Sequence, residues 1–367
     1  MKIGIVLEPN HETRVSLLPD AVATLISKGH EVCVESQAGM SAFASNEEYA
    51  KVGAAIADAQ TVIQSSDIIL SIHTEPVLHA QSKTLIGVYS PLVNTDAINN
   101  FSLNGNTLFS LDMLPRTTRA QSMDVLSSQA NIAGYKAVLL AATTYSRYFP
   151  MFMTAAGSIA PAKVLILGAG VAGLQAIATA RRLGAVVEVF DTRPAVKEEV
   201  MSLGAKFIEV EGAADASKAG GYAVEQSEEF KGRQQERIAE SAAKSDIIIT
   251  TAQIPGKKAP ILITEDMIHA MRKGSVIIDL AASTGGNTPL TQNNQTVMHN
   301  GITIIGNSNL PALMPSDASK VYGKNIINFL PLITNGDNQL SLNLEDDLVK
   351  GTCIMQAGTI IHERLSK

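Results

Sequence analysis

A chain of 367 residues predicts two or three domains, because one domain takes about 150 residues. Hydrophobic residues make up 46% of the chain and charged residues 17%, so a large core can be buried and extensive disorder is excluded. The net charge is −6, and no run of lysine or arginine stands out. This balance argues against nucleic-acid binding as the main function, since phosphate neutralisation needs clustered cations.

The two cysteines and the apolar segments exclude several other classes. Cys33 and Cys353 stand alone, which predicts reduced thiols of an intracellular protein and neither a disulfide framework nor a zinc site. The apolar run Ile3–Leu7 is too short for a signal peptide, because Glu8 follows it. The longest uncharged stretch, 280–316, is rich in Asn, Gln, Thr and Gly, so we expect no membrane-spanning segment.

Short apolar runs alternate with helical patterns along most of the chain, which predicts an α/β fold of βαβ units. Most of the runs are continuously apolar, as in parallel strands that are covered on both faces. The expected strands are Ile3–Leu7, Glu31–Glu35, Asp67–Ile72, Leu85–Tyr89, Thr107–Leu111, Val164–Leu167, Val186–Phe190, Ile247–Thr250, Val276–Leu280 and Ile302–Ile305. The expected helices are Leu17–Lys28, Gly173–Leu183, Ala195–Leu203, Glu228–Lys244, Thr264–Met271 and Ser319–Phe329.

The boundary between two α/β parts is expected near residues 124–160. One long helix is predicted from Ser127 to Tyr148, with Ser127 or Ser128 as its N-cap. We expect a first subdomain of residues 1–126 and 307–367 and a second of residues 127–306. The tail predicts a terminal hairpin of 340–344 and 352–356 around Lys350-Gly351.

The segment Glu211–Gly232 differs from the rest in being rich in Ala, Gly, Ser and charge. One interpretation is a surface loop between a strand and a helix. The other is a hinged lid, in which the glycines at 220 and 221 absorb dihedral change and Tyr222 supplies the covering ring.

The most informative motif is a strand, a glycine turn and a helix start. It contains Gly168, Gly170 and Gly173 in the Gly-x-Gly-x-x-Gly pattern of dinucleotide-binding turns. The first glycine permits the tight turn, the second lets a pyrophosphate approach the backbone, and the third lets the helix pack on the strand. The helix N-terminus then offers free N–H groups to the phosphates.

Asp191 ends the next strand, 23 positions after Gly168, where an acidic residue can accept both ribose hydroxyls of an adenosine. A 2′-phosphate near this carboxylate would meet repulsion of about 1–4 kcal/mol, which Arg193 can soften. The sequence therefore favours NAD(H) over NADP(H).

A second polar constellation, residues 115–129, precedes the long helix and contains Arg116, Arg119, Gln121, Asp124 and Ser127. Such side chains can hold an amide, a phosphate or a carboxylate. Arg116 and Asp124 can equally form a solvated salt bridge on a turn. The position at the expected domain boundary, where dinucleotide sites often lie, favours a functional site.

Other catalytic motifs are absent from the sequence. None of the seven histidines has the spacing of a metal site, and there is no GxSxG motif, phosphate-binding GxxxxGK[ST] motif or Cys/His nucleophile pair. His73 and His79 flank Glu75-Pro76 and are most simply solvated loop residues.

Several long motifs resemble the NAD(H)-binding domain I of proton-translocating transhydrogenase, a member of the alanine dehydrogenase/transhydrogenase family. The resemblance covers essentially the whole chain. The motifs that carry it are residues 116–135, 153–157 and 168–180, the Asp-Thr-Arg-Pro segment at 191–194, the Ile-Pro-Gly-Lys segment at 254–257, and residues 275–281 and 285–287.

The resemblance implies two Rossmann-like, doubly wound parallel-sheet subdomains linked by long helices, with NAD(H) in a cleft between them. It implies direct hydride transfer between NAD(H) on this chain and NADP(H) on a partner domain III, coupled to proton passage through a membrane domain II. It also implies a homodimer, on the cytoplasmic side of the inner (plasma) membrane and held there through partner subunits.

The resemblance further assigns roles to individual residues. Those expected around the nicotinamide and its ribose are Arg116, Thr117, Thr118, Gln121, Asp124 and Ser127, with Gln121 reaching toward the partner nucleotide. The pyrophosphate would lie on Ala169, Gly170 and Val171, and the adenosine ribose on Asp191, Thr192 and Arg193. The mobile loop would be that of Gly221 and Tyr222, with Gln234 and Gln253 at the adenine and ribose end. Gln253 departs from the family's apolar pattern, which leaves a backbone contact possible.

Alanine dehydrogenase is the nearest alternative. Glu12-Thr-Arg14-Val resembles its substrate-arginine segment, but transhydrogenases share those residues, so Arg14 does not discriminate between the two. That reaction needs a general acid/base and a carboxylate anchor. The lysine and histidine of the alanine dehydrogenase pattern are replaced here by Thr74 and by the region of Pro91. Hydride transfer between two nicotinamides needs alignment and excluded water instead. A non-catalytic NAD-sensing module is a further alternative, which the presence of Gln121 and Tyr222 disfavours.

Overall fold

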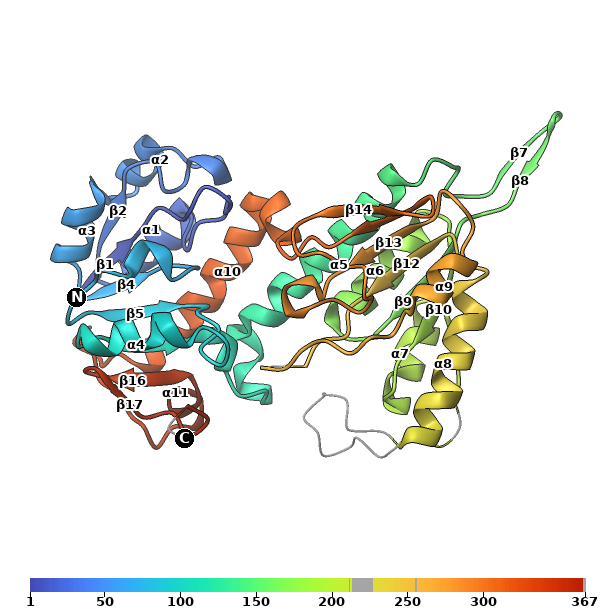
Figure 1. The fold of residues 1–367 in the computed structure, drawn as a ribbon. Coiled ribbons are helices and arrows are strands. Elements are labelled where there is room, and N and C mark those ends of the chain that lie inside the picture. The colour runs from blue at the N-terminus through green and yellow to red at the C-terminus, as the bar shows by residue number, and fades with distance from the viewer. Residues whose placement is uncertain (211, 213–226, 255, 366–367) are drawn as a thin grey trace. The chain divides into compact units, whose positions relative to one another are not determined.

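The chain folds as two α/β units, described here from a computed structural model of residues 1–210, 212, 227–254 and 256–365 (Figure 1). Unit 1 is Met1–Gln129 with Pro311–Lys367, and unit 2 is Ala130–Leu310. Both chain ends therefore belong to unit 1, and the chain passes into unit 2 within a single helix, α5 (Val125–Thr144). The boundaries lie three to four residues beyond those expected from the sequence, at 126/127 and 306/307.

Unit 1 is built on an eight-stranded mixed sheet of order β17-β16-β6-β5-β4-β1-β2-β3. Its strands are β1 (Lys2–Ile5), β2 (Glu31–Glu35), β3 (Ala55–Ala57), β4 (Ile68–Leu70), β5 (Thr84–Gly87), β6 (Thr107–Ser110), β16 (Cys353–Gln356) and β17 (Thr359–Ile360). The six neighbouring strands β6, β5, β4, β1, β2 and β3 are all parallel. The strand β16 is antiparallel to both β6 and β17. The parallel part has the 3-2-1-4-5-6 order of doubly wound folds, with its switch point between β1 and β4.

Helices cover both faces of this sheet because its strands alternate between two apolar clusters. Ile3 and Ile5 face one cluster with α1 and α10, whereas Leu85 and Leu108 face the other with α3 and α4. The helices of unit 1 are α1 (Pro19–Ser27), α2 (Asn46–Lys51), α3 (Ala59–Ser65), α4 (Thr95–Leu103), α10 (Pro315–Phe329) and α11 (Asp347–Thr352). Burial on both faces explains why the strands read as continuous apolar runs.

Unit 2 repeats this plan with a seven-stranded sheet of order β11-β10-β9-β12-β13-β15-β14. Its strands are β9 (Lys163–Leu167), β10 (Val186–Phe190), β11 (Lys206–Phe207), β12 (Ile247–Thr250), β13 (Val276–Asp279), β14 (Thr296–His299) and β15 (Ile302–Ile305). All pairs are parallel except β14 with β15. Across this sheet the strand order reverses between β9 and β12, because β10 and β11 lie on one side of β9 and β12 lies on the other. Ligands bind at such a switch point in doubly wound sheets.

The helices of unit 2 also pack on both faces of its sheet. They are α5, α6 (Val171–Arg182), α7 (Lys197–Ser202), α8 (Glu228–Ala242) and α9 (Glu265–Ala270). Val164 and Ile166 pack with α5, α6 and α7, whereas Leu165 and Leu167 pack with α8 and α9. The α/β class with parallel-rich sheets is thereby confirmed.

A separate two-stranded hairpin, β7 (Phe152–Thr154) and β8 (Gly157–Ile159), projects away from the sheet of unit 2 (Figure 1). It carries exposed apolar side chains, with Met151 62% and Met153 73% exposed. A two-stranded hairpin is marginal by itself in water, so these side chains are unusual for a surface that faces only solvent.

The structure corrects three local predictions. The long helix spans Val125–Thr144, so it begins and ends earlier than the predicted 127–148. The terminal hairpin is formed by β16 and β17, while Lys350-Gly351 lies inside α11. Residues 228–232 belong to α8 and not to the loop predicted for 211–232.

Two other expectations concern chemistry and membranes. Cys33 and Cys353 are both free and buried. Among the residues that the structure describes, no helix combines the length and the apolar character needed to cross a bilayer.

Candidate functional site

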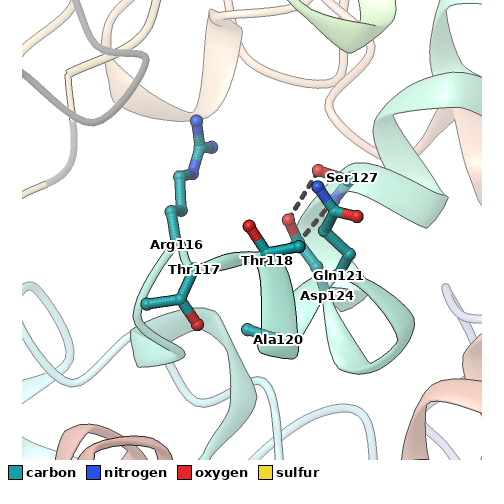
Figure 2. A pocket seen from close by; sticks show the side chains of 7 residues that line it. All are labelled: Arg116, Thr117, Thr118, Ala120, Gln121, Asp124 and Ser127. Atoms are coloured by element: carbon teal, nitrogen blue, oxygen red, sulfur yellow. Dashed lines mark hydrogen bonds between the residues drawn. The ribbon is translucent and has the colours of Figure 1, made fainter.

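A pocket of about 310 Å³ lies in unit 1, on the polar loop that precedes α5 (Figure 2). Its lining residues are Arg116, Thr117, Thr118, Ala120, Gln121, Asp124 and Ser127. All six residues that the family resemblance assigns to the nicotinamide end therefore line one pocket. Figure 2 shows the Gln121 amide beside Asp124 and Ser127. Arg116 lies on the far side of Thr118 from this group (Figure 2).

Asp124 organises the start of α5 from inside this pocket. Its Oδ1 accepts the backbone N–H of Ser127 at 2.9 Å, and its Oδ2 accepts the Ser127 hydroxyl at 2.6 Å. This is the N-cap bond of the helix, so the prediction of Ser127 or Ser128 as the N-cap was wrong. Asp124 and Ser127 hold each other in fixed positions, which leaves Gln121 as the exposed amide of the pocket.

The loop under the pocket is anchored from two sides. Asn325 and Asn328 of α10 both donate to the backbone oxygen of Ser122, at 2.9 and 3.0 Å. Arg119 makes an ion pair with Asp346 at 2.6 Å, at the start of α11. The short helical turn 118–123 that carries Gln121 is thus preorganised.

The second set of predicted residues forms the glycine turn after β9 in unit 2. Gly168 has φ +103°, and a Cβ there would lie 2.3 Å from Thr251 Oγ1. A Cβ on Gly173 would lie 1.9 Å from the Gly168 oxygen, whereas a Cβ on Gly170 would meet nothing within 4 Å. Two glycines are thus required by packing, and the middle one borders open space, as a pyrophosphate-binding turn requires.

The N-terminus of α6 is well suited to hold an anion. Its N-cap is Gly170, and no described side chain caps it, so its first-turn N–H groups remain available for phosphate oxygens. The start of α6 also packs closely against α5, because a Cβ on Gly134 of α5 would lie 2.1 Å from the Ala172 oxygen. These observations fit a bound dinucleotide phosphate.

Asp191 is held tightly at the end of β10. Its carboxylate accepts the N–H of Ala169 at 2.7 Å, the backbone N–H of Arg193 at 2.8 Å, and Nε and Nη2 of Arg193 at 2.9 and 2.7 Å. A carboxylate offers about four acceptor positions, so all of them are used here. A ribose that binds Asp191 must therefore take positions that the Arg193 guanidinium now occupies.

The remaining predicted residues are less closely grouped. Gln253 follows β12, and its Nε2 donates to the Leu280 oxygen at 2.8 Å. Asn287 holds this loop by donating to the Ala252 and Pro260 oxygens, at 2.9 and 2.8 Å. Gln234 is buried on α8, and Thr192 is half-buried beside Asp191. Gly221 and Tyr222, predicted to close over the ligand, lie outside the described residues.

Sequence reasoning missed a buried polar cluster at the switch point of the unit 1 sheet. The Glu8 carboxylate accepts the N–H groups of Ile72 and His73, at 2.5 and 3.1 Å. Glu12 is buried between Arg14, whose Nη2 lies 2.6 Å from Oε2, and His73, whose Nε2 lies 2.9 Å from Oε2. His73 is therefore not the solvated loop residue that was predicted, whereas His79 is exposed. The sequence signals were the Glu12-Thr-Arg14-Val segment and the spacing of Glu8 and Glu12 after the first strand.

Burial shapes the ionisation of this cluster. It raises the pKa of Glu8 to about 7, against the lowering effect of the N–H groups of Ile72 and His73. Burial also tends to raise the pKa of Glu12. The hydrogen bonds from Arg14 and His73 lower it by more, so the pKa of Glu12 lies well below its usual range.

Glu8 should make the stability of unit 1 depend on pH. The ordinary pKa of a glutamate is 4.5, and the pKa of Glu8 in the folded chain is about 7. Between these two pH values the folded chain keeps a proton on Glu8 that the unfolded chain releases. The contribution of Glu8 to the free energy of unfolding is therefore complete below pH 4.5 and is lost as the pH rises through about 7. The loss amounts to up to about 3 kcal/mol. Urea unfolding of the wild type and Glu8→Gln between pH 4 and 8 tests this. We expect a shallower fall for the variant, and parallel pH curves would contradict the assignment.

Comparisons with known proteins cover almost the whole chain. Residues 4–133 match the family model described as alanine dehydrogenase/PNT, N-terminal domain. Residues 137–363 match the one described as alanine dehydrogenase/PNT, C-terminal domain.

Individual relatives agree with these matches. The chain is 44% identical to the first of the separate parts of NAD(P) transhydrogenase subunit alpha in Rhodospirillum rubrum, over 100% of this chain and 99% of that protein. It is 28% identical to alanine dehydrogenase of Staphylococcus epidermidis, over 91% and 88% of the two chains. The solved transhydrogenase structure from Sinorhizobium meliloti matches with a TM-score of 0.89 at 42% identity, covering 98% of this chain and 100% of that one.

Proposed function

Because the chain belongs to the alanine dehydrogenase/PNT family, we propose that it is the NAD(H)-binding component of a proton-translocating NAD(P) transhydrogenase. Its similarity to transhydrogenase alpha subunits over its whole length supports this choice. In the proposed reaction, a hydride passes directly between NAD(H) held by this chain and NADP(H) held by a partner domain, and a membrane partner couples the transfer to proton movement.

The glycine turn supports the NAD(H) part of the proposal. The open space at Gly170 and the uncapped start of α6 would hold the pyrophosphate, with Ala169 and Val171 on either side. Asp191, Thr192 and Arg193 would hold the adenosine ribose, and Gln234 and Gln253 the adenine end. Arg116 with Thr117 and Thr118, and Asp124 with Ser127, would surround the nicotinamide and its ribose.

The observation that carries the proposal is the character of the pocket at Gln121. Among the described residues, those that line it are an arginine, two threonines, an alanine, an exposed amide and an Asp–Ser pair whose carboxylate caps α5, with no histidine, lysine or cysteine. Direct hydride transfer needs no general base, because it needs alignment of two rings and exclusion of water. Gln121, on its anchored turn, would set the position of the ring toward the partner nucleotide, and Tyr222 would close over it.

Alanine dehydrogenation is less compatible with the residues of unit 1. Arg14, the cation of the substrate-arginine segment, is bound by Glu12 through its Nε and Nη2 atoms at 2.8 and 2.6 Å, but it does not separate the two reactions because transhydrogenases share this segment. Thr74 stands where that reaction would use lysine, and it is buried. The site therefore favours transfer to a second nucleotide over oxidation of a small metabolite.

The proposed partners are a second copy of this chain, an NADP(H)-binding domain III and a membrane domain II. Names of relatives as a subunit alpha support a complex with other subunits. The apolar hairpin of β7 and β8, with Met151, Met153 and Ile159 exposed, is the segment that we expect to take part in dimer formation. Attachment to the membrane would be indirect, through the partner subunits.

A partner-dependent turnover assay tests the proposal. Purified chain is mixed with a domain III protein and NADP(H), and the reduction of an acetylpyridine analogue of NAD by NADH is measured. We expect turnover only when the chain, the domain III protein and NADP(H) are all present. Turnover with alanine and NAD alone would favour the dehydrogenase, and NADH binding without any turnover would favour a sensing module.

Asp191→Ala should weaken NADH binding by about 1–3 kcal/mol, because charge-assisted hydrogen bonds to the ribose are lost. Calorimetric titration with NADH measures this change. Glu188→Ala, on the strand β10 that Asp191 follows and paired with Lys206 at 2.9 Å, is the matched control and should keep wild-type affinity. Unchanged affinity in Asp191→Ala would refute the ribose assignment.

A further inference from the structure

A surface cluster of three metal-ligand side chains lies in unit 2, apart from the residues assigned to the nucleotide. It consists of Glu265 and His269 on α9 and His299 on β14, whose ligand atoms all lie within 4.8 Å of one another. The Nε2 atoms of the two histidines are 2.8 Å apart. Glu265 Oε1 lies 4.0 Å from Nε2 of His269 and 3.6 Å from Nε2 of His299.

Local structure brings these side chains together across 30 residues of sequence. Glu265 and His269 are four residues apart on a helix and therefore share one face. His299 is the last residue of β14 and pairs with Ile302 at the start of β15. The turn before β13 is tied to the turn before β15, because the Gly274 N–H donates to the Gly301 oxygen at 2.8 Å.

The separations fit a small divalent cation. Tetrahedral Zn²⁺ with ligands at about 2.0–2.1 Å needs ligand atoms about 3.3 Å apart. The three observed separations of 2.8, 3.6 and 4.0 Å bracket this value, and exposed side chains can close the difference by small rotations. Two imidazoles and a carboxylate are also the ligands that Zn²⁺ and its first-row neighbours prefer.

The contact between the histidines is itself informative. Their ring planes are nearly parallel, at an interplanar angle of 14°, and their centroids lie 5.0 Å apart. With both Nε2 atoms directed at each other at 2.8 Å, one must carry a proton and the other must accept it. A cation can replace that shared proton and bind both nitrogens, with the Glu265 carboxylate supplying a negative charge.

We propose that Glu265, His269 and His299 form a binding site for a first-row divalent cation, with Zn²⁺ as the reference ion. Three protein ligands leave at least one coordination position for water. The site would join α9 to the edge strand β14. It lies at the amino ends of β13 and β15, whereas the glycine turn follows the carboxyl end of β9, so the cation would not touch the residues proposed to hold NAD(H).

Calorimetric titration of the full chain with Zn²⁺ alone tests the site. We expect binding of one ion per chain, and a loss of affinity of at least about 10-fold in each of His269→Gln and His299→Gln, since even outer-shell partners of metals contribute that much. His79→Gln, at an exposed histidine of unit 1, is the matched control and should bind as the wild type does. Glu265→Gln should also weaken binding.

Two results would overturn the site. One is the absence of binding heat with Zn²⁺ in excess over the wild-type chain, and the other is wild-type affinity in His269→Gln and His299→Gln. Because the three side chains are exposed or half-buried, the variants should fold, and unfolding curves without metal verify this. Co²⁺ provides a second readout, since a site of this type gives a visible absorption band that both histidine variants should lose.

Discussion

Gln121→Asn is expected to lower the rate of hydride transfer by about 100-fold while NADH affinity stays nearly unchanged. The side chain is exposed in the pocket, beside Asp124 and Ser127 (Figure 2), and the substitution keeps the amide but withdraws it by one methylene. A misplacement of about 1 Å at a reacting centre can cost about 100-fold in rate, even when binding is kept. The rate is measured in the partner-dependent assay, and affinity by calorimetric titration with NADH.

The outcome for Gln121 can be separated from general damage. Gln60→Asn, at an exposed glutamine on α3, is the matched control and should leave both rate and affinity at wild-type values. Equal losses of affinity and rate in Gln121→Asn would mean that this amide grips the nucleotide and does not position it. An unchanged rate would remove Gln121 from the reaction altogether.

Gly170→Ala is expected to weaken NADH binding by about 10-fold or more without destabilising the chain. A Cβ at this position meets nothing within 4 Å, and the backbone has φ −81°, so alanine fits the unliganded fold. A pyrophosphate that approaches the backbone there would meet the new methyl group, and about 1.4 kcal/mol of strain already corresponds to a factor of ten. Calorimetric titration and urea unfolding give the two quantities.

Two other glycines serve as comparisons for Gly170→Ala. Gly173→Ala places a Cβ 1.9 Å from the Gly168 oxygen, so we expect a loss of both folding stability, by about 1–3 kcal/mol, and NADH binding. Gly232→Ala, on α8 with open space around its Cβ, should leave binding unchanged and stabilise the helix slightly. Wild-type NADH affinity in Gly170→Ala would contradict the placement of the pyrophosphate.

The sequence predicted the central strands of both sheets because their burial on two faces makes them continuously apolar. It missed the edge strands, such as β14, whose exposed and half-buried residues alternate, and short polar helices such as α4. The terminal turn was misplaced because Gly351 was interpreted as a turn residue. In the structure this glycine serves close packing, since a Cβ there would lie 2.4 Å from Pro115 Cγ.

The candidate site was predictable only where its geometry is local in sequence. The glycine turn and the loop that carries Gln121 each lie within a few residues, and their backbone requirements are visible in the residue types. The cluster of Glu8, Glu12 and His73 joins residues more than 60 positions apart, through the pairing of β1 with β4. His269 and His299 are 30 positions apart and meet because β15 pairs both with β13, the strand that follows α9, and with β14.

Isotope transfer tests the central claim most directly. The chain is incubated with a domain III protein, NADP⁺ and NADH that carries deuterium at the transferable position of the nicotinamide. Direct passage of hydride from this chain's nucleotide to the partner's predicts NADPH that retains the deuterium, with none released to water. Deuterium in the solvent, or no labelled NADPH while both nucleotides are bound, would contradict it.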